Sequence, residues 1–336
     1  MNNKIMAICD KEEKYLYRII ECFEAREFLP FTIYAFTGAE ELIKFSVTKE
    51  IELLLIAENS YENEIKKLPI AQIMILNESG REVGEGIKNI NKYQSGQEIL
   101  RDIMDSYAGE AGYFLRKRQA GSHMKIIGNY TPVRRCLQTT FALTMGQILA
   151  KEYKVLYLNF ESYSGLSYLM NRDFNVDITD VIYLLNCEKE KLTYRLAGMV
   201  QSINGMDFIP PVVSYKDLCS VTGEQWLHLF QEIERASAYD YLVLDLSEQM
   251  HGLFDILRQC FRVYTITRED SFAAAKMKQY EAMLRMTDYQ DVASKIRKWN
   301  LPVFHRLPCG LEQLTHGELA GYVRKIVEED IYGKTG

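Results

Sequence analysis

The chain has 336 residues, of which 47% are hydrophobic and 26% are charged, and its net charge is −6. This composition is ordinary for a globular protein and leaves room for about two domains. No apolar run reaches the ~18–20 residues that a membrane-spanning helix needs, and the first residues lack the apolar region of a secretory signal. The seven scattered cysteines favour a reducing cytoplasm over a disulfide framework, so we expect a cytoplasmic protein.

The negative charge is concentrated in the first third of the chain. Residues 1–108 contain 13 Lys and Arg against 19 Asp and Glu, which is the whole net charge of −6; the remaining residues contain 27 of each. An acidic surface opposes non-specific nucleic-acid binding, because such binding needs positive charge to displace phosphate counterions. The basic clusters at 116–118 and 134–135 are short. We therefore expect no nucleic-acid partner.

The first 108 residues alternate between apolar runs and segments of helical periodicity. The apolar runs predict strands at 4–9, 31–36, 51–56, 71–76 and 90–93. The periodic segments predict helices at 12–27, 40–45 and 96–107. Ser95 is expected to cap the last of these helices, because a serine oxygen can accept a bond from an amide of the first turn. Strands separated by helices indicate a parallel sheet covered on both faces.

This domain resembles a response-regulator receiver domain at two strand ends and departs from it at a third. Asp10 follows the first strand, and Lys92 follows the last. The phosphoacceptor position falls on Ala57, whose methyl group cannot accept a phosphoryl group, and Glu58 would point to the other face. The resemblance implies a pseudo-receiver used for interaction or dimerisation. The alternative is a flavodoxin-like domain without receiver ancestry, since a fold does not fix a function.

A linker is predicted at 109–124, where three glycines accompany Arg116-Lys117-Arg118. Its last residues, Gly121-Ser122-His123-Met124, resemble a cloning remnant as much as a native linker.

Residues 125–336 repeat the alternation and predict a second doubly wound parallel-sheet domain. Strands are predicted at 125–128, 154–158, 241–245 and 262–266. Helices are predicted at 139–152, 272–284 and 318–331. The last helix is acidic, so it is a poor match to a basic membrane anchor and is expected to pack on the core.

Between the first strand and first helix of this domain lies the position of a phosphate-binding loop, where backbone amides face an anion. The segment 131–140 resembles the deviant Walker A loop of the MinD/ParA ATPases, written KGGxGKTT, which implies a P-loop NTPase fold. The residues at the family's lysine and glycine positions are Val133, Arg134, Arg135, Leu137 and Gln138. Thr139 and Thr140 keep the two threonines.

Two later strand ends support the same resemblance. Glu161 keeps the second acid of a strand-end pair whose first acid is replaced by Asn159, and Asp245 ends a strand of Walker B form. If a nucleotide binds, the resemblance implies ATP held with Mg²⁺ at Thr139 and Asp245. The implied nucleotide-contacting residues are Arg134, Arg135, Gln138, Thr139, Thr140, Glu161 and Asp245.

The substitutions predict lost catalysis, because phosphoryl transfer depends on positive groups placed against developing charge. Both loop lysines are gone, and side chains replace glycines where the backbone would need positive φ. Arg134 and Arg135 either clamp phosphates with their guanidinium groups or are solvated or paired with acidic neighbours.

A metal site and a reactive cysteine are not expected elsewhere. His305, Cys309 and His316 lack the paired spacing of a zinc site, and nothing but two neighbouring arginines favours a redox role for Cys136.

A receiver-like domain followed by a MinD/ParA-like ATPase domain with a degenerate loop resembles the TadZ/CpaE family. The resemblance implies a localisation and assembly factor for a Flp (tight adherence) type pilus or secretion machine. It also implies a homodimer that recruits assembly proteins at a cell pole, with at most indirect membrane association. The alternatives are an active MinD-like ATPase with a rewritten loop and a divergent signalling output protein.

Overall fold

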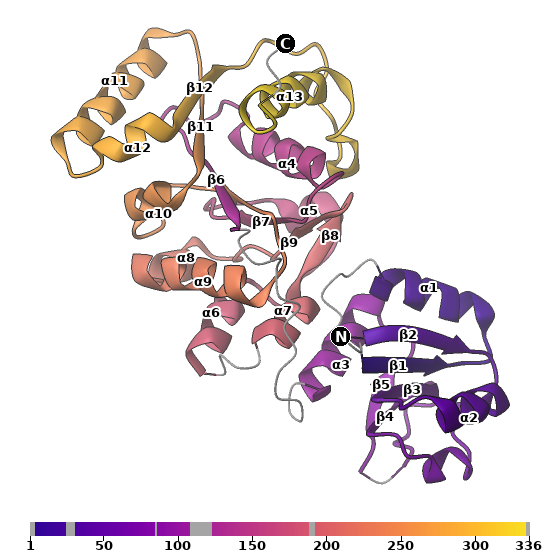
Figure 1. The fold of residues 1–336 in the computed structure, drawn as a ribbon. Helices are drawn as coiled ribbons and strands as arrows, with labels where there is room; N and C mark the ends of the chain where they lie inside the picture. The colour runs from indigo at the N-terminus through magenta and orange to yellow at the C-terminus, as the bar shows by residue number, and fades with distance from the viewer. Residues whose placement is uncertain (1–3, 25–30, 85, 108–122, 188–191, 334–336) are drawn as a thin grey trace. The chain divides into compact units, whose positions relative to one another are not determined.

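The computed structural model describes residues 4–24, 31–84, 86–107, 123–187 and 192–333. The chain divides into two compact units, residues 1–116 with 188–198 and residues 117–187 with 199–336 (Figure 1). The predicted linker at 109–124 lies outside the described residues apart from its last two. The predicted domain limits therefore stay a prediction.

The first unit is built on a five-stranded sheet in the order β2-β1-β3-β4-β5, and all of its strand pairs are parallel. Its strands are β1 (Lys4–Cys9), β2 (Phe31–Phe36), β3 (Leu53–Ala57), β4 (Gln72–Asn77) and β5 (Lys88–Asn91). Its helices are α1 (Glu13–Glu24), α2 (Ala39–Thr48) and α3 (Gly96–Tyr107), with short 3-10 turns at Glu58–Ser60 and Ile65–Lys67. The doubly wound parallel sheet predicted from the sequence is confirmed.

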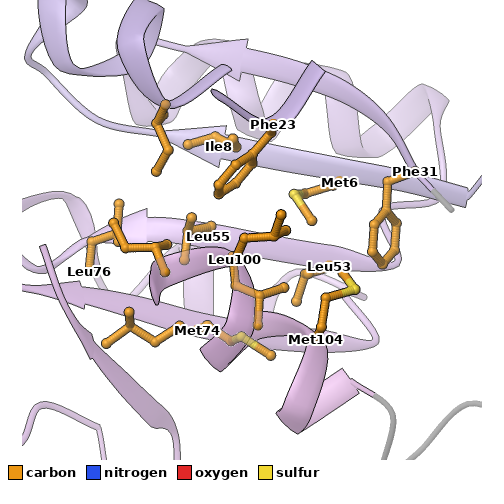
Figure 2. Packing of buried hydrophobic residues seen from close by; sticks show 14 of the residues in the cluster. Met6, Ile8, Phe23, Phe31, Leu53, Leu55, Met74, Leu76, Leu100 and Met104 are labelled. Carbon is orange, nitrogen blue, oxygen red and sulfur yellow. The ribbon is translucent and has the colours of Figure 1, made fainter. Parts of the chain in front are cut away.

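Helices cover both faces of this sheet because alternate strand residues point to opposite sides. On one face, residues of α1 and α3 pack with Met6, Leu55 and other strand residues in a single buried cluster. Figure 2 shows Phe23 of α1 and Leu100 of α3 among the side chains of this cluster. On the other face, Leu42 of α2 packs with the intervening strand residues.

Helix α3 begins as its sequence predicts. The Ser95 hydroxyl accepts a hydrogen bond from the Glu98 amide at 3.3 Å, and the Glu98 carboxylate accepts one from the Ser95 amide at 2.9 Å. This reciprocal pair is a capping box, which satisfies amides that have no partner within the helix.

The second unit is built on a seven-stranded sheet in the order β12-β11-β6-β10-β7-β9-β8. Only the β8–β9 pair is antiparallel among the strand pairs of the described residues. Its strands are β6 (Lys125–Asn129), β7 (Val155–Asn159), β8 (Gln201–Ile203), β9 (Met206–Phe208), β10 (Tyr241–Asp245), β11 (Arg262–Thr267) and β12 (Ile296–Asn300). The sequence analysis located β6, β7, β10 and β11 but not the three outer strands.

The helices of the second unit fall between these strands (Figure 1). They are α4 (Gln138–Leu149), α5 (Leu166–Met170), α6 (Ile178–Cys187), α8 (Tyr215–Ser220), α9 (Gly223–Ala236), α10 (Leu253–Gln259), α11 (Ser271–Met286), α12 (Gln290–Lys295) and α13 (Gly317–Asp330). A further helix, α7 (Leu192–Met199), spans the boundary between the two units. Of the helices in the described part of the chain, none is long and apolar enough to cross a membrane.

Helix α4, which follows the predicted phosphate loop, lies in the core of the second unit. It packs against the central strands and against α13, so the predicted core packing of the last helix is confirmed. Every residue from Phe141 to Leu149 is buried. Close packing on all sides leaves α4 little room for added atoms.

The two mid-helix glycines of α4 and α13 make a matched test of this packing. A Cβ at Gly146 would lie 2.3 Å from the Met206 sulfur, whereas one at Gly321 would meet nothing within 4 Å. Alanine gains about 1 kcal/mol over glycine in an exposed helix, but overpacking a core costs about 1–3 kcal/mol. Urea unfolding should show a smaller gain in stability, or a loss, for Gly146→Ala than for Gly321→Ala, because the Met206 side chain must move to make room. Equal gains in both variants would contradict the packing of α4 against Met206.

Candidate phosphate loop and receiver-like site

The receiver-like site lies at the carboxyl ends of the strands and centres on the buried Lys92. Its ammonium group lies 2.8 Å from Asp10 Oδ2, 2.7 Å from Glu78 Oε1 and 3.2 Å from Glu12 Oε1, and 4.8 Å from the centre of the Tyr15 ring. Burial alone would lower the pKa of Lys92. The hydrogen bonds to Asp10 and Glu78, together with the charge of Asp10, raise it by more, so the net shift of the pKa is upward. Lys92 is therefore charged and neutralised by carboxylates of its own chain.

The phosphoacceptor position contributes no carboxylate to this cluster. Ala57 ends β3 and is fully buried. The next residue, Glu58, accepts hydrogen bonds from the amides of Glu78 and Ser79, each at 3.0 Å, and from the Ser79 hydroxyl at 2.7 Å. The bonds from Ser79 and Glu78 lower the pKa of Glu58. The structure thus brings together Asp10 and Lys92, the two receiver positions named from the sequence. Besides Asp10 and Glu12, a third carboxylate contacts Lys92, and it comes from Glu78 after β4.

The candidate phosphate loop connects β6 to α4 and retains a glycine-type backbone without glycines. Arg134, Arg135 and Leu137 have φ of 64°, 51° and 64°. These values lie in the left-handed region, which costs an L-residue other than glycine roughly 1–2 kcal/mol. All three residues stand at the glycine positions of the aligned MinD/ParA loop. The loop has therefore lost the glycines but not the turn that they would make easy.

At the start of α4, Gln138 turns its amide toward the end of β10. Its Nε2 donates to Asp245 Oδ1 at 2.6 Å and to the Leu246 carbonyl at 3.0 Å, and it lies 3.4 Å from Glu161 Oε1. Gln138 is itself buried. The side chain at the lysine position of the aligned loop thus bonds to the two candidate acids.

Asp245 is surrounded by neutral donors. Its Oδ2 accepts from the Tyr157 hydroxyl at 3.1 Å and from Asn159 Nδ2 at 3.0 Å. Burial raises the pKa of Asp245, and hydrogen bonds from Gln138, Thr139 and Tyr157 oppose that rise only in part. Both oxygens that would face a metal are occupied by these donors. The arrangement therefore does not fit Mg²⁺. Elsewhere in the described residues, no three or more His, Cys, Asp or Glu side chains gather as a metal site, so His305, Cys309 and His316 do not form one.

Glu161 lies at the wall of the same site and is the more exposed of its two acids. Burial and, to a smaller extent, the negative charge of Asp245 raise the pKa of Glu161, and Arg134 opposes them; the net pKa is about 7. Near neutral pH both the protonated and the charged form of Glu161 are therefore populated.

An open pocket of about 600 Å³ lies over the loop. The predicted residues that line it are Arg134, Arg135, Gln138, Thr139, Thr140 and Glu161. Arg134 forms an ion pair with Glu248, and Lys276 of α11 donates to the Val133 carbonyl at 3.4 Å. Arg135 is exposed and makes no hydrogen bond or ion pair with the described residues. A third arginine, Arg268, also lines the pocket and pairs with Asp270 at 3.6 Å, so Arg135 is the unpaired one of the three lining arginines within the described residues.

Several residues of these sites carry no sequence motif and were not predicted. They are Glu12, Glu78, Tyr157, Glu248 and Lys276. Glu78 follows β4 in the first unit and Glu248 follows β10 in the second, each at the carboxyl edge of its own sheet, where α/β proteins bind ligands; that placement was the available signal. Lys276 comes from a helix distant in sequence, so no local pattern could place it.

Removing the buried lysine tests the receiver-like cluster. Lys92→Met leaves three carboxylates around one apolar side chain, and breaking a buried ion pair costs about 3–5 kcal/mol. Urea unfolding should show this loss, with partial recovery when Glu78→Gln is added. Lys88→Met, on the exposed end of β5, should change stability by less than ~0.5 kcal/mol. A similar small effect at Lys92 would contradict the cluster.

The raised pKa of Glu161 predicts a pH dependence of stability. Folded Glu161 holds its proton to a higher pH than the unfolded chain, so stability falls as pH rises from about 4.5 to about 7. Glu161→Gln should remove a decline on the order of 2 kcal/mol from urea unfolding curves measured across this window. Glu41→Gln, at an exposed position of α2, should keep it. Parallel pH profiles for wild type and Glu161→Gln would refute the shift.

Comparison with known proteins matches one family description to residues of the first unit and finds solved structures that resemble part of the chain at low identity. Residues 1–108 match the family described as TadZ-like, receiver domain. No curated protein matches the sequence.

Three of the solved structures that resemble part of this chain are the following. A ParA family ATPase from Chlorobium tepidum TLS is 16% identical, with 52% of this chain and 72% of that chain covered and a TM-score of 0.44. A putative plasmid partition protein from Borrelia burgdorferi B31 bound to AMPPNP is 12% identical, with 62% and 100% covered and a TM-score of 0.43. MinC:MinD from Aquifex aeolicus is 15% identical, with 52% and 67% covered and a TM-score of 0.39.

Residues 1–108 thus match the receiver domain of the TadZ-like family, as the resemblance drawn from the sequence led us to expect for this part of the chain.

Proposed function

We propose that this chain is a localisation and assembly factor for a Flp (tight adherence) type pilus or secretion machine. In this proposal it acts as a homodimer in the cytoplasm, at a cell pole near the inner face of the membrane, and recruits assembly proteins through its surfaces. The TadZ-like receiver domain supports the family context. The chemistry of the two strand-end sites supports a role without catalysis.

The observation that carries the proposal is the bond between Gln138 and Asp245. An amide replaces the charged amine that would stabilise a transferring phosphoryl group, and its N–H points at a carboxylate of the chain. Catalysis of phosphoryl transfer is mainly positioned positive charge, so a neutral donor that is already engaged contributes little to it. The second unit then serves as a scaffold with weak nucleotide binding or none.

The receiver-like site supports the same conclusion by a separate route. Phosphorylation requires a carboxylate nucleophile, and Ala57 supplies a methyl group. Lys92, which would otherwise respond to a phosphoryl group, contacts Asp10 and Glu78 instead. A site neutralised by its own chain has no charge change to transmit, which disfavours a signalling output protein that accepts phosphate.

A second candidate function is a working ATPase with a rewritten loop. It is favoured by the left-handed backbone at Arg134, Arg135 and Leu137, which keeps the turn that presents amides to phosphate. In that candidate the two arginines replace the lysines as phosphate-binding groups, and Thr139 and Asp245 hold Mg²⁺ once Gln138 has moved away. The pocket of about 600 Å³ is large enough for a nucleotide-sized ligand.

Nucleotide measurements separate the two candidates. A factor without catalysis should show background turnover with Mg-ATP, unchanged by Asp245→Ala, and little rise in melting temperature. A ligand at 100 times its Kd would stabilise the folded state by about 2.7 kcal/mol, so even modest binding is detectable. Turnover well above background that Asp245→Ala abolishes would refute the proposal.

A restored loop is the matched control for the nucleotide measurement. The substitutions are Val133→Lys, Arg134→Gly, Arg135→Gly, Leu137→Gly and Gln138→Lys. Tighter Mg-ATP binding by this variant than by wild type would assign the loss of nucleotide affinity to these side chains.

The assembly role is tested by following a fluorescent assembly ATPase in cells that lack the chain. The polar focus should be lost and should return with wild type or with Arg134→Ser/Arg135→Ser. A focus that persists without the chain would contradict the assembly role.

A further inference from the structure

A second groove lies beside the candidate phosphate loop and plays no part in the sites described above. Its volume is about 740 Å³, and it is formed by three segments of the second unit. These are the loop after β7 with the start of α5, the segment that leads into α6, and the residues before α8. Glu161 lines the loop pocket and the next residue, Ser162, lines the groove, so both lie along the carboxyl edge of the sheet.

The groove gathers several large apolar side chains that are exposed to solvent. Tyr163, Tyr168 and Val213 are 85%, 91% and 90% exposed, and all three line it. Phe174 lines it too and packs edge-on against Phe208, with ring centres 5.9 Å apart. Single exposed apolar residues are normal on a surface, but several that gather at one concave site mark an interaction surface.

The charge of the groove is of one sign. Asp173, Asp177 and Asp180 line it, and no Lys or Arg is among its lining residues. Asp177 and Asp180 accept bonds from the neutral Thr179 and Asp177 amides, at 2.7 and 2.8 Å, so their negative charges are not neutralised. Asp173 is exposed and has no hydrogen-bond or ion-pair partner among the described residues.

We propose that this groove docks a partner segment that presents an Arg or Lys side chain beside an apolar one. The inference rests on the proposed recruitment function and names the chemistry of the partner. A guanidinium or ammonium group can pair with Asp173 and lie over a tyrosine ring, while the apolar neighbour packs on Val213. A symmetric contact with a second copy would place these aspartates against each other, and like charges in contact are unfavourable.

Peptide selection on the full chain tests this chemistry. Phage-displayed random peptides that bind wild type should be enriched in Arg or Lys next to an apolar residue. Selected peptides, synthesised with a fluorophore and measured by anisotropy, should bind Asp173→Lys and Tyr168→Ser about tenfold or more weakly. Raising the salt concentration should weaken binding to wild type, because the contact is charged and near solvent. Both substitutions are at exposed positions and should leave the fold intact.

Glu41→Lys and Tyr17→Ser, at exposed positions of α2 and α1, are the matched controls and should bind as wild type does. Selected peptides without basic residues, or equal binding to Asp173→Lys, would overturn the inference. So would a dimer in wild type that Tyr168→Ser dissociates, because a second copy would then occupy the groove. If these tests fail while the assembly ATPase still needs the chain for its focus, only the groove assignment falls. If the focus persists without the chain, the proposed function fails whatever the peptides do.

Discussion

The hydrogen bond between Gln138 and Asp245 is the constraint on which the interpretation of the second unit depends. It joins the first residue of α4 to the last residue of β10, and it is made inside the buried edge of the sheet. A lysine at this position would carry a charge into the pocket, whereas the amide satisfies a buried carboxylate with a neutral donor. Because burying an unpaired carboxylate is costly, Asp245 holds Gln138, Tyr157 and Asn159 in place as they hold it.

The first unit applies the same principle with the charges reversed. Lys92 is the buried charge there, and Asp10, Glu12 and Glu78 surround it. In both units a polar group at the carboxyl edge of a parallel sheet, where α/β folds bind ligands, is satisfied from within the chain. The difference lies in what remains open. The first site is closed around its lysine, while the second keeps a pocket over a loop whose backbone retains the left-handed turn at Arg135.

The sequence predicted the central strands well because β1, β3 and β10 are continuous apolar runs, which only buried strands of a parallel sheet require. It did not predict the edge strand β12 (Ile296–Asn300), whose sequence IRKWN contains two basic residues and no clean alternation. Edge strands tolerate such residues because one side faces solvent, so their signal is weak. The partners of Lys92 were equally hidden. Glu78 meets it only because β4 and β5 are neighbours in the sheet, which is a tertiary fact rather than a local pattern.

The polar groups at the carboxyl edge of each sheet bond to each other, and this affects where on the chain a ligand or partner can bind favourably. When the groups at the strand ends bond to each other, the free energy that a ligand could gain there is reduced by the bonds it must break. In the groove lined by Tyr168, Val213 and Asp173, the Asp173 carboxylate has no hydrogen-bond or ion-pair partner in the described part of the chain, and the tyrosine ring is already exposed to water. A partner that covers it gains apolar burial and a charge pair without displacing a contact of the chain. The balance of desolvation therefore favours protein recognition beside the loop over chemistry within it.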